Sequence, residues 1–353
     1  MKKLFCVLLA AALCLGLAAC GGPAASADYT VAIVQQMDHS SLDEIREAVK
    51  AGLDALAEEK GITIAYEEFN GQNDTTTLNQ IGTQVVSEGY DAIIPIATLA
   101  AQCMVNAADG TGIPVIYAAI SDPAEAGVEG FSNVTGTSDA LNTEFILDMM
   151  LAADPDVQTV GLLYSNSEPN SATPIAQAKA YLEEKGIAYV EKTGNTNDEI
   201  LSAVASLIGQ VDAVFTPTDN VVMAAAAAVS EQLAAAGIPF YAGADSFVKA
   251  GAFATCGVNY TELGTYTAGM AVDILQGGEV PEYHVMEGGI ITVNTETAAA
   301  LGLDAAVFDG MAGTVVEVAT QTTAAMADPI MPQINGKWNF RLTPNMAGSV
   351  TPR

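Results

Sequence analysis

Six short polar segments carry most of the side chains in this sequence that could bind a small polar molecule. Each follows an apolar run that is typical of a buried strand, and together they offer hydroxyl, amide and carboxylate groups. The segments are His39-Ser40-Ser41, Ala97-Thr98, Ser121-Asp122, the loop 165–171 with Ser167, Glu168 and Asn170, Thr218-Asp219-Asn220, and Asp245-Ser246. Ligands of open α/β sheets bind outside the carboxyl ends of the strands. The six segments together therefore predict a binding cleft, although any one of them alone could be an ordinary polar loop.

The sequence lacks the residues and motifs that enzymes of the common classes use. The chain has only two histidines, His39 and His284, which leaves little for acid–base or metal chemistry. It contains no G-x-S-x-G elbow, P-loop, H-E-x-x-H motif or dinucleotide-binding glycine pattern. We therefore expect a binding protein without a cofactor or metal rather than an enzyme, and we expect His39 to be a loop residue outside the site.

The charges narrow the choice of ligand. With 12 Lys and Arg against 42 Asp and Glu, the chain should repel nucleic acid and anionic membrane surfaces. Arg46, Arg341 and Arg353 are its only arginines, whereas phosphate and dicarboxylate sites usually employ arginine. A small zwitterion fits such a cleft better than a polyanion. A sugar or nucleoside is the alternative, although the single tryptophan, Trp338, lies far outside these segments.

An internal repeat predicts the architecture. The sequence AEEKGI at 57–62 returns as LEEKGI at 182–187, and GIPVIYAA at 112–119 returns as GIPFYAGA at 237–244. Both pairs are offset by 125 residues, from Gly61 to Gly186 and from Gly112 to Gly237. Within each copy, apolar strands alternate with amphipathic helices, as in a parallel sheet covered on both faces. The fold class expected is α/β, with two doubly wound parallel-sheet lobes joined by a three-segment hinge.

The expected boundaries follow from this repeat. Lobe one comprises residues 29–136 plus 256–281, and lobe two comprises 137–255 plus 282–304. Residues 305–353 are Thr-, Ala-, Met- and Pro-rich without a clear period. We expect this extension to be disordered, with a small docked element as the alternative. Cys103 and Cys256 would both lie in lobe one, as buried free thiols or, alternatively, as a disulfide.

The amino terminus is a targeting segment. Lys2 and Lys3 precede a short apolar run that ends in Leu-Ala-Ala-Cys at 17–20, and this resembles a bacterial lipoprotein signal. The resemblance implies that residues 1–19 are removed, that the Cys20 thiol is lipidated, and that residues 20–28 tether an extracytoplasmic protein to the cell membrane. A transmembrane anchor is disfavoured because the apolar run is too short to cross a bilayer.

Several motifs together resemble a known family. They are HSSLDEIREAVKAGL (39–53), NVTGTSD (133–139), YSNSEPNS (164–171), PTDN (217–220) and GVNYTELGTYTAGMAVDILQGG (257–278). Over residues 29–304 the chain is similar to the ABC-transporter substrate-binding lipoproteins of the TrpX-like kind. The resemblance implies a monomer of the type I periplasmic-binding fold that delivers an amino acid, of an aromatic or other kind, to a permease and its ATPase.

The resemblance also implies residue roles. The ligand carboxylate would meet a helix N-terminus near Ser40, Ser41 and Thr98. The ammonium group would meet Asp219, with Glu168 or Asp122 as alternates, although Asp219 could instead only cap a helix. Tyr260 could stack on an aromatic ligand or simply pack in the core, and Asn259 would lie at a crossover between the lobes. Ser121, Ser167, Asn170, Asn220 and Asp245 complete the expected ligand-binding set.

Overall fold

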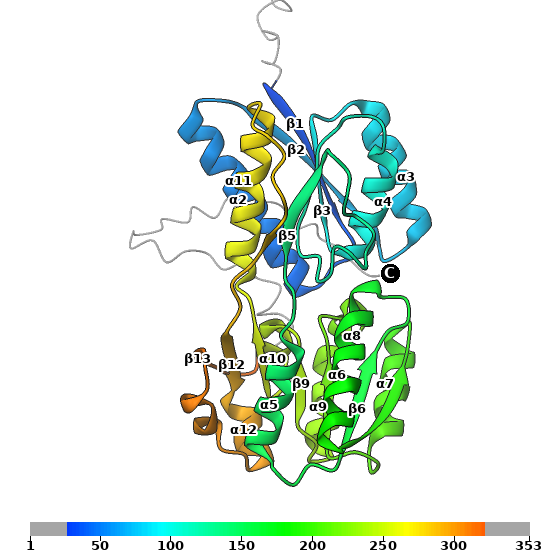
Figure 1. Cartoon of the computed structure of the whole chain (residues 1–353), viewed down its shortest axis with the longest axis vertical. Coiled ribbons are helices and arrows are strands. Elements are labelled where there is room, and N and C mark those ends of the chain that lie inside the picture. Colours follow the sequence, from blue (N-terminus) through cyan, green and yellow to red (C-terminus); the bar gives the residue numbers. More distant parts are fainter. Residues whose placement is uncertain (1–26, 322–353) are drawn as a thin grey trace, which may run out of the picture.

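The computed structural model describes residues 27–321, which form two α/β lobes stacked along the long axis of the molecule (Figure 1). The sheet of lobe one has the strand order β2-β1-β3-β4-β5-β11, and that of lobe two has the order β7-β6-β8-β9-β10-β12-β13. The lobe-one strands are β1 (Tyr29–Gln35), β2 (Ile64–Asn70), β3 (Ala92–Ile96), β4 (Val115–Tyr117), β5 (Val134–Ser138) and β11 (His284–Val285). The lobe-two strands are β6 (Thr159–Tyr164), β7 (Ala188–Thr193), β8 (Ala213–Thr216), β9 (Phe240–Ala242), β10 (Ala254–Gly257), β12 (Ile290–Asn294) and β13 (Thr314–Val318).

Both sheets confirm the expected doubly wound α/β class. Every strand pair in lobe one is parallel, and in lobe two only β10 and β12 run antiparallel. The helices are α2 (Ser40–Lys60), α3 (Thr75–Glu88), α4 (Thr98–Ala108), α5 (Thr143–Ala153), α6 (Ala172–Lys185), α7 (Asn197–Leu207), α8 (Asn220–Ala224), α9 (Ala226–Ala235), α10 (Asp245–Lys249), α11 (Tyr260–Leu275) and α12 (Thr295–Leu301), with 3-10 turns at η1 (Pro169–Ser171) and η2 (Ala305–Gly310).

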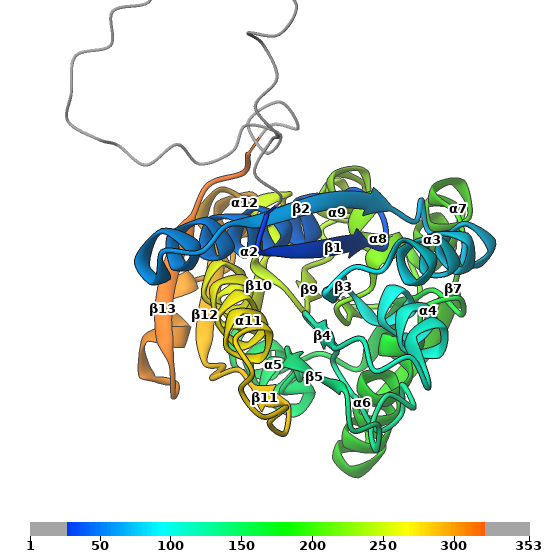
Figure 2. The same cartoon turned by 90° about the horizontal axis from the view of Figure 1, so that it is seen from above.

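The core explains why the strands are continuous apolar runs. Along β1, Val31 and Ile33 pack beneath α2 and α11, whereas Ala32 and Val34 pack against α3 and α4 on the opposite face (Figure 2). A strand with a helix layer on each side has no solvent face and so lacks the alternation of polar and apolar residues.

The internal repeat is visible in the helix ends. Gly61 and Gly186 each end a helix in the left-handed region, at φ 66° and 71°, where glycine avoids the strain that a side chain brings.

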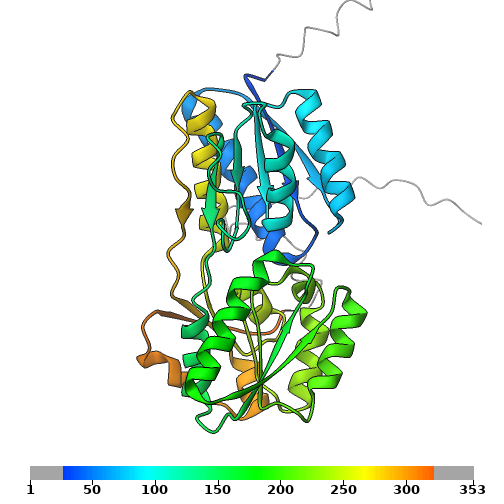
Figure 3. The same cartoon turned by 45° about the vertical axis from the view of Figure 1, so that its right-hand side comes forward.

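Three chain segments cross between the lobes, and Figure 3 shows them running along one edge of the molecule. They follow β5, follow β10 and join β11 to β12. Two of our expected boundaries were wrong. β10, with Cys256, belongs to the sheet of lobe two, and β11 belongs to that of lobe one. Gly288 and Gly289 lie between β11 and β12 and carry the chain from one sheet to the other.

The expectation of disorder from residue 305 was wrong for residues 305–321. Phe308 of η2 is fully buried, and β13 pairs in parallel with β12 at the edge of the lobe-two sheet. A five-residue strand beside Thr- and Ala-rich segments gives little periodic signal, which is why the sequence did not reveal it. Residues 322–353, with Trp338, lie outside the described residues.

Cys103 on α4 and Cys256 on β10 are both buried and free, as preferred, although they lie in different lobes. The lipoprotein signal and Cys20 lie outside the described residues. No helix within residues 27–321 is long and apolar enough to cross a membrane.

Helices α2 and α11 pack closely because small residues face one another. An added Cβ at Gly264 would lie 2.7 Å from the Cβ of Ala48 and 2.7 Å from the carbonyl oxygen of Ile45, and one at Gly52 would lie 2.7 Å from the Cβ of Ala268. The pair therefore tolerates no larger side chain at these positions. Since His39 and Tyr260 flank the first turns of these two helices, the packing fixes one wall of the cleft described next.

Candidate ligand-binding cleft

A narrow cavity of about 20 Å³ lies between the lobes, at the carboxyl ends of β1, β3, β4, β8 and β9. This is the place that the doubly wound topology favours for a ligand. Lobe one and its helix α11 contribute His39, Ser41, Leu42, Ile45, Ala97, Thr98, Ala119, Ser121, Asp139 and Tyr260, and lobe two contributes Asn170, Thr218, Asp219, Asn220, Met223, Ala244 and Phe247. The cavity thus has a polar part and an apolar wall.

The structure brings part of the expected set together at this cavity. Seven of the residues expected from the sequence line it, namely Ser41, Thr98, Ser121, Asn170, Asp219, Asn220 and Tyr260. The other six do not line it, namely Ser40, Asp122, Ser167, Glu168, Asp245 and Asn259. Strand order and loop polarity predict which loops reach the cleft. They do not predict which side chain of each loop points inward.

Three of the six residues outside the lining have their polar groups engaged elsewhere. Asp122 accepts a hydrogen bond from Thr173 across the cleft at 2.8 Å, and Asp245 forms an ion pair with Lys249 at 2.6 Å. Asn259 caps α11 by accepting from the backbone N–H of Glu262. Ser167 is exposed, and Ser40 places a buried hydroxyl with no partner at the start of α2.

Asp139 lines the cavity and was missed by the sequence analysis. Its carboxylate accepts from the Ser121 hydroxyl at 2.9 Å and from the Tyr260 hydroxyl at 3.1 Å, and no lysine or arginine within residues 27–321 pairs with it. Burial raises the pKa of Asp139, an effect that these two hydrogen bonds oppose. The residue follows β5, a Thr- and Gly-containing strand that was not recognised as part of the sheet. The motif NVTGTSD that ends in Asp139 was the available signal.

Asp219 is held mainly by its own lobe. One carboxylate oxygen accepts from the backbone N–H of Val222 at 2.9 Å, which caps α8, and the other accepts from the Ser165 N–H and the Ser171 hydroxyl, each at 2.7 Å. Burial nevertheless raises the pKa of Asp219. Burial and the nearby Asp219 charge also raise the pKa of Glu168, to about 8.

Several hydrogen bonds join the lobes across the cavity. Gln36 bonds Glu168 at 2.8 Å, His39 bonds Asn220 at 2.9 Å, and Ser121 bonds Thr218 at 3.1 Å. The hydroxyls of Ser41 and Ser246 also meet. Because both lobes supply partners, these contacts exist only in a closed arrangement of the two lobes.

Two strained residues and three unpaired atoms mark the cavity as a site. Ala97 and Ala119 line it with φ of 76° and 59°, a region that residues other than glycine rarely adopt. Among its lining side chains, the Thr98 hydroxyl, the Asn170 carbonyl oxygen and the Nδ1 atom of His39 are buried without a partner. Unpaired buried polar atoms are costly, so they indicate positions where a ligand would supply the missing hydrogen bonds.

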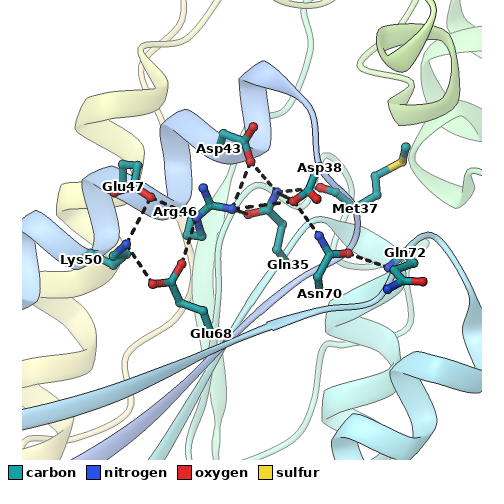
Figure 4. Close-up of polar contacts among 10 residues, drawn as sticks. All are labelled: Gln35, Met37, Asp38, Asp43, Arg46, Glu47, Lys50, Glu68, Asn70 and Gln72. Carbon is teal, nitrogen blue, oxygen red and sulfur yellow. Dashed lines mark hydrogen bonds and ion pairs between the residues drawn. The ribbon is translucent and has the colours of Figure 1, made fainter. Parts of the chain in front are cut away.

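Arg46 is the single arginine within residues 27–321, and it does not line the cavity. Figure 4 shows its polar contacts. Arg46 lies 3.1 Å from Asp43 and 3.2 Å from Glu68, and it donates to the Gln35 side chain at 2.9 Å. Gln35 in turn donates to the carbonyl oxygen of Met37 at 2.7 Å. This network holds the loop between β1 and α2, and with it His39, in place.

The chain matches known proteins over most of its length. The family model described as ABC transporter substrate binding protein matches residues 30–306. A protein of Clostridioides difficile strain R20291 named tyrosine-binding protein is 32% identical over 281 residues, which cover 77% of this chain and 81% of that protein.

Two solved structures resemble this one. A Streptococcus pneumoniae ABC domain in complex with L-Trp is 30% identical and has a TM-score of 0.75 over 82% of this chain and 99% of that chain. A ligand-free, open substrate-binding protein with adhesive properties from Clostridium difficile is 31% identical, but its TM-score is 0.62 over 83% of this chain and 100% of that chain. The TM-score is thus higher for the L-Trp complex than for the open structure, although the identities are nearly equal. These relatives are solute-binding proteins rather than enzymes. The chain belongs to the family of ABC transporter substrate-binding proteins.

Proposed function

We propose that this protein captures an aromatic amino acid outside the cytoplasm and delivers it to an ABC importer. The observation that carries the proposal is the composition of the cavity, which offers a buried carboxylate, unpaired hydrogen-bonding groups and an apolar wall, with no arginine. The names of its relatives, one a tyrosine-binding protein and one a complex with L-Trp, support the same ligand class.

The ligand ammonium group is assigned to Asp139. A cation in a closed cleft needs a carboxylate partner, and Asp139 lines the cavity without an ion pair to any other described residue. Ser121 and Tyr260 orient the carboxylate from two directions. Asp219, the partner that the sequence favoured, already accepts three hydrogen bonds from its own lobe, so its role is the helix cap.

The ligand carboxylate is assigned to the first turn of α4. Thr98 begins this helix, its hydroxyl has no partner, and the preceding residue, Ala97, supplies no side-chain cap. Gln36 accepts from the Leu99 N–H at 3.1 Å, and the remaining N–H groups of the first turn, with the positive end of the helix dipole, favour an anion there. β3, which precedes α4, is separated from β5 only by β4, so Thr98 and Asp139 can hold the two charges on one Cα.

The side chain would then lie along the apolar wall. Leu42 and Ile45 of α2 face Met223 and Phe247 of lobe two across the cavity. An aromatic ring would enter as these side chains move apart, and its burial between them is favourable because it removes a large apolar area from water. A sugar would leave this wall in contact with hydroxyl groups.

Three further features complete the proposal. Lipidation of Cys20 would hold the protein on the outer side of the cell membrane. A permease and an ATPase would be the transport partners, as the family implies. The protein would act as a monomer.

A screen of protein that has been unfolded to strip bound ligand and then refolded tests the proposal. Tyrosine, tryptophan and phenylalanine should raise its melting temperature, whereas leucine, glucose and adenosine should raise it little or not at all, because ligands that bind the native state stabilise it. Stabilisation by glucose or adenosine and by none of the amino acids would contradict the proposal.

A further inference from the structure

In the imidazole ring of His39, one nitrogen forms a hydrogen bond and the other has no hydrogen-bond partner. Its Nε2 atom lies 2.9 Å from the Asn220 carbonyl oxygen, while the Asn220 amide N–H donates to Glu168 at 2.6 Å. Gln36 donates to the other oxygen of Glu168 at 2.8 Å. Because the amide N–H of Asn220 is directed at the carboxylate, its oxygen faces His39, and Nε2 must be the donor.

The ring is neutral and has a single proton. Burial lowers the pKa of His39 to about 4, against a weaker opposing effect of the hydrogen bond to Asn220. With the proton on Nε2, the Nδ1 atom carries a lone pair, and this atom is buried without a partner. His39 therefore presents a hydrogen-bond acceptor at a cavity in which ligand groups can donate.

Both His39 and Asp139 line the cavity, and the strand order separates them along it. Asp139 follows β5 and His39 follows β1, and the order β5-β4-β3-β1 separates these strands by three spacings, or about 14 Å. An amino acid held at Asp139 and Thr98 would extend its side chain past Leu42 toward His39. The acceptor thus meets the far end of the side chain and not the ammonium group.

We infer that Nδ1 of His39 accepts a hydrogen bond from the ligand side chain, either the phenol O–H of tyrosine or the indole N–H of tryptophan. This rests on the proposed function and narrows it, because phenylalanine has no donor at that end. Bound phenylalanine would leave the Nδ1 lone pair buried and unpaired, which costs more than the hydrogen bond itself contributes. His39 is therefore a specificity-determining residue.

A matched pair of ligands and one variant test this inference. At pH 8.5, where Glu168 is largely ionised, calorimetric titration should show that the wild type binds tyrosine roughly 5- to 150-fold more tightly than phenylalanine. His39→Leu also removes the bond to Asn220 that joins the lobes, so it should weaken binding of both ligands, but tyrosine by more, and bring the ratio to within about threefold. Equal binding of both ligands by the wild type, or an unchanged ratio in the variant, would overturn the inference while the proposed function stands. If neither ligand binds, both fail.

A second measurement needs no variant in the cleft. Since the chain has only two histidines, nitrogen-15 labelling of histidine gives a simple spectrum, and His284→Gln assigns it. Nδ1 of His39 should show the shift of an unprotonated nitrogen, and tyrosine but not phenylalanine should move that signal. A protonated Nδ1, or the same change with both ligands, would overturn the inference.

Discussion

The Nε2 atom of Gln36 in lobe one lies 2.8 Å from a carboxylate oxygen of Glu168 in lobe two. Both side chains are buried, and Glu168 shares its surroundings with the second buried carboxylate, Asp219. An open cleft would return Glu168 to water. Closure of the lobes therefore changes the electrostatic environment of this carboxyl group, and several measurable effects should follow.

Ligand binding should be accompanied by uptake of protons. The pKa of Glu168 in the closed protein is raised above its ordinary value, so the closed state holds more protons than the open state between these two values, from about pH 4.5 to about pH 8. Affinity for tyrosine should accordingly fall as the pH rises through this window. Calorimetric titration at pH 7 in buffers of different ionisation enthalpy measures the number of protons directly.

Glu168→Gln should remove most of that uptake, whereas Glu183→Gln on the exposed surface should retain it. The same proton number in wild type and Glu168→Gln would show that another group is responsible.

Contact between α2 and α11 predicts opposite effects for two glycines of the same helix. At Gly264 a new Cβ would lie 2.7 Å from Ala48 and from backbone of α2, whereas at Gly269 nothing lies within 4 Å. Gly264→Ala should therefore destabilise the protein by about 1–3 kcal/mol, and Gly269→Ala should stabilise it by about 0.4–1 kcal/mol. Denaturant unfolding of both variants measures the difference. Equal effects would show that the two helices do not pack as described.

Ligand-dependent closure should be visible in solution. The hydrogen bonds from Gln36, His39 and Ser121 to lobe two form only when the lobes meet. Addition of tyrosine to ligand-stripped protein should therefore reduce the radius of gyration measured by X-ray scattering. An identical scattering profile at saturation would indicate a body that is closed without ligand.

The membrane anchor can be tested independently of the cleft. Cys20→Ser should abolish incorporation of labelled fatty acid and release the protein from the membrane fraction, because the lipid is its proposed attachment. Cys103→Ser, which alters a buried thiol of the folded domain, is the matched control and should stay lipidated. Labelling that survives in Cys20→Ser would contradict the signal assignment.

The repeat and the apolar periodicity predicted the fold well. Strands such as β3 are apolar throughout, and helix ends such as that of α2 are marked by a glycine, Gly61. β5 and β13 were missed because their Thr- and Gly-containing or short sequences depend on pairing with a neighbouring strand for stability. The apolar run after β8 forms two helices, α8 and α9, which Ala225 separates.

The site was predicted at the level of loops and not of side chains. Asp219 was expected to bind the ligand because it is a carboxylate in a strand-end loop. In the structure its oxygens instead accept hydrogen bonds from groups of its own lobe. Asp139 could be recognised as a site residue only from the structure. There, pairing of β5 with β4 places it beside Ser121 and Tyr260. His39 looked like a loop residue, because its role depends on Asn220, which lies 181 positions away in the sequence.

The assignment of the ligand ammonium group to Asp139 is tested most directly by one comparison of affinities. Tyrosine should bind Asp139→Asn about 30- to several-thousand-fold more weakly than the wild type, since loss of one partner of a buried charge pair costs about 2–5 kcal/mol. Asp148→Asn, at a carboxylate that also accepts from a tyrosine hydroxyl but does not line the cavity, should bind like the wild type. Unchanged tyrosine affinity in a folded Asp139→Asn protein would contradict the account.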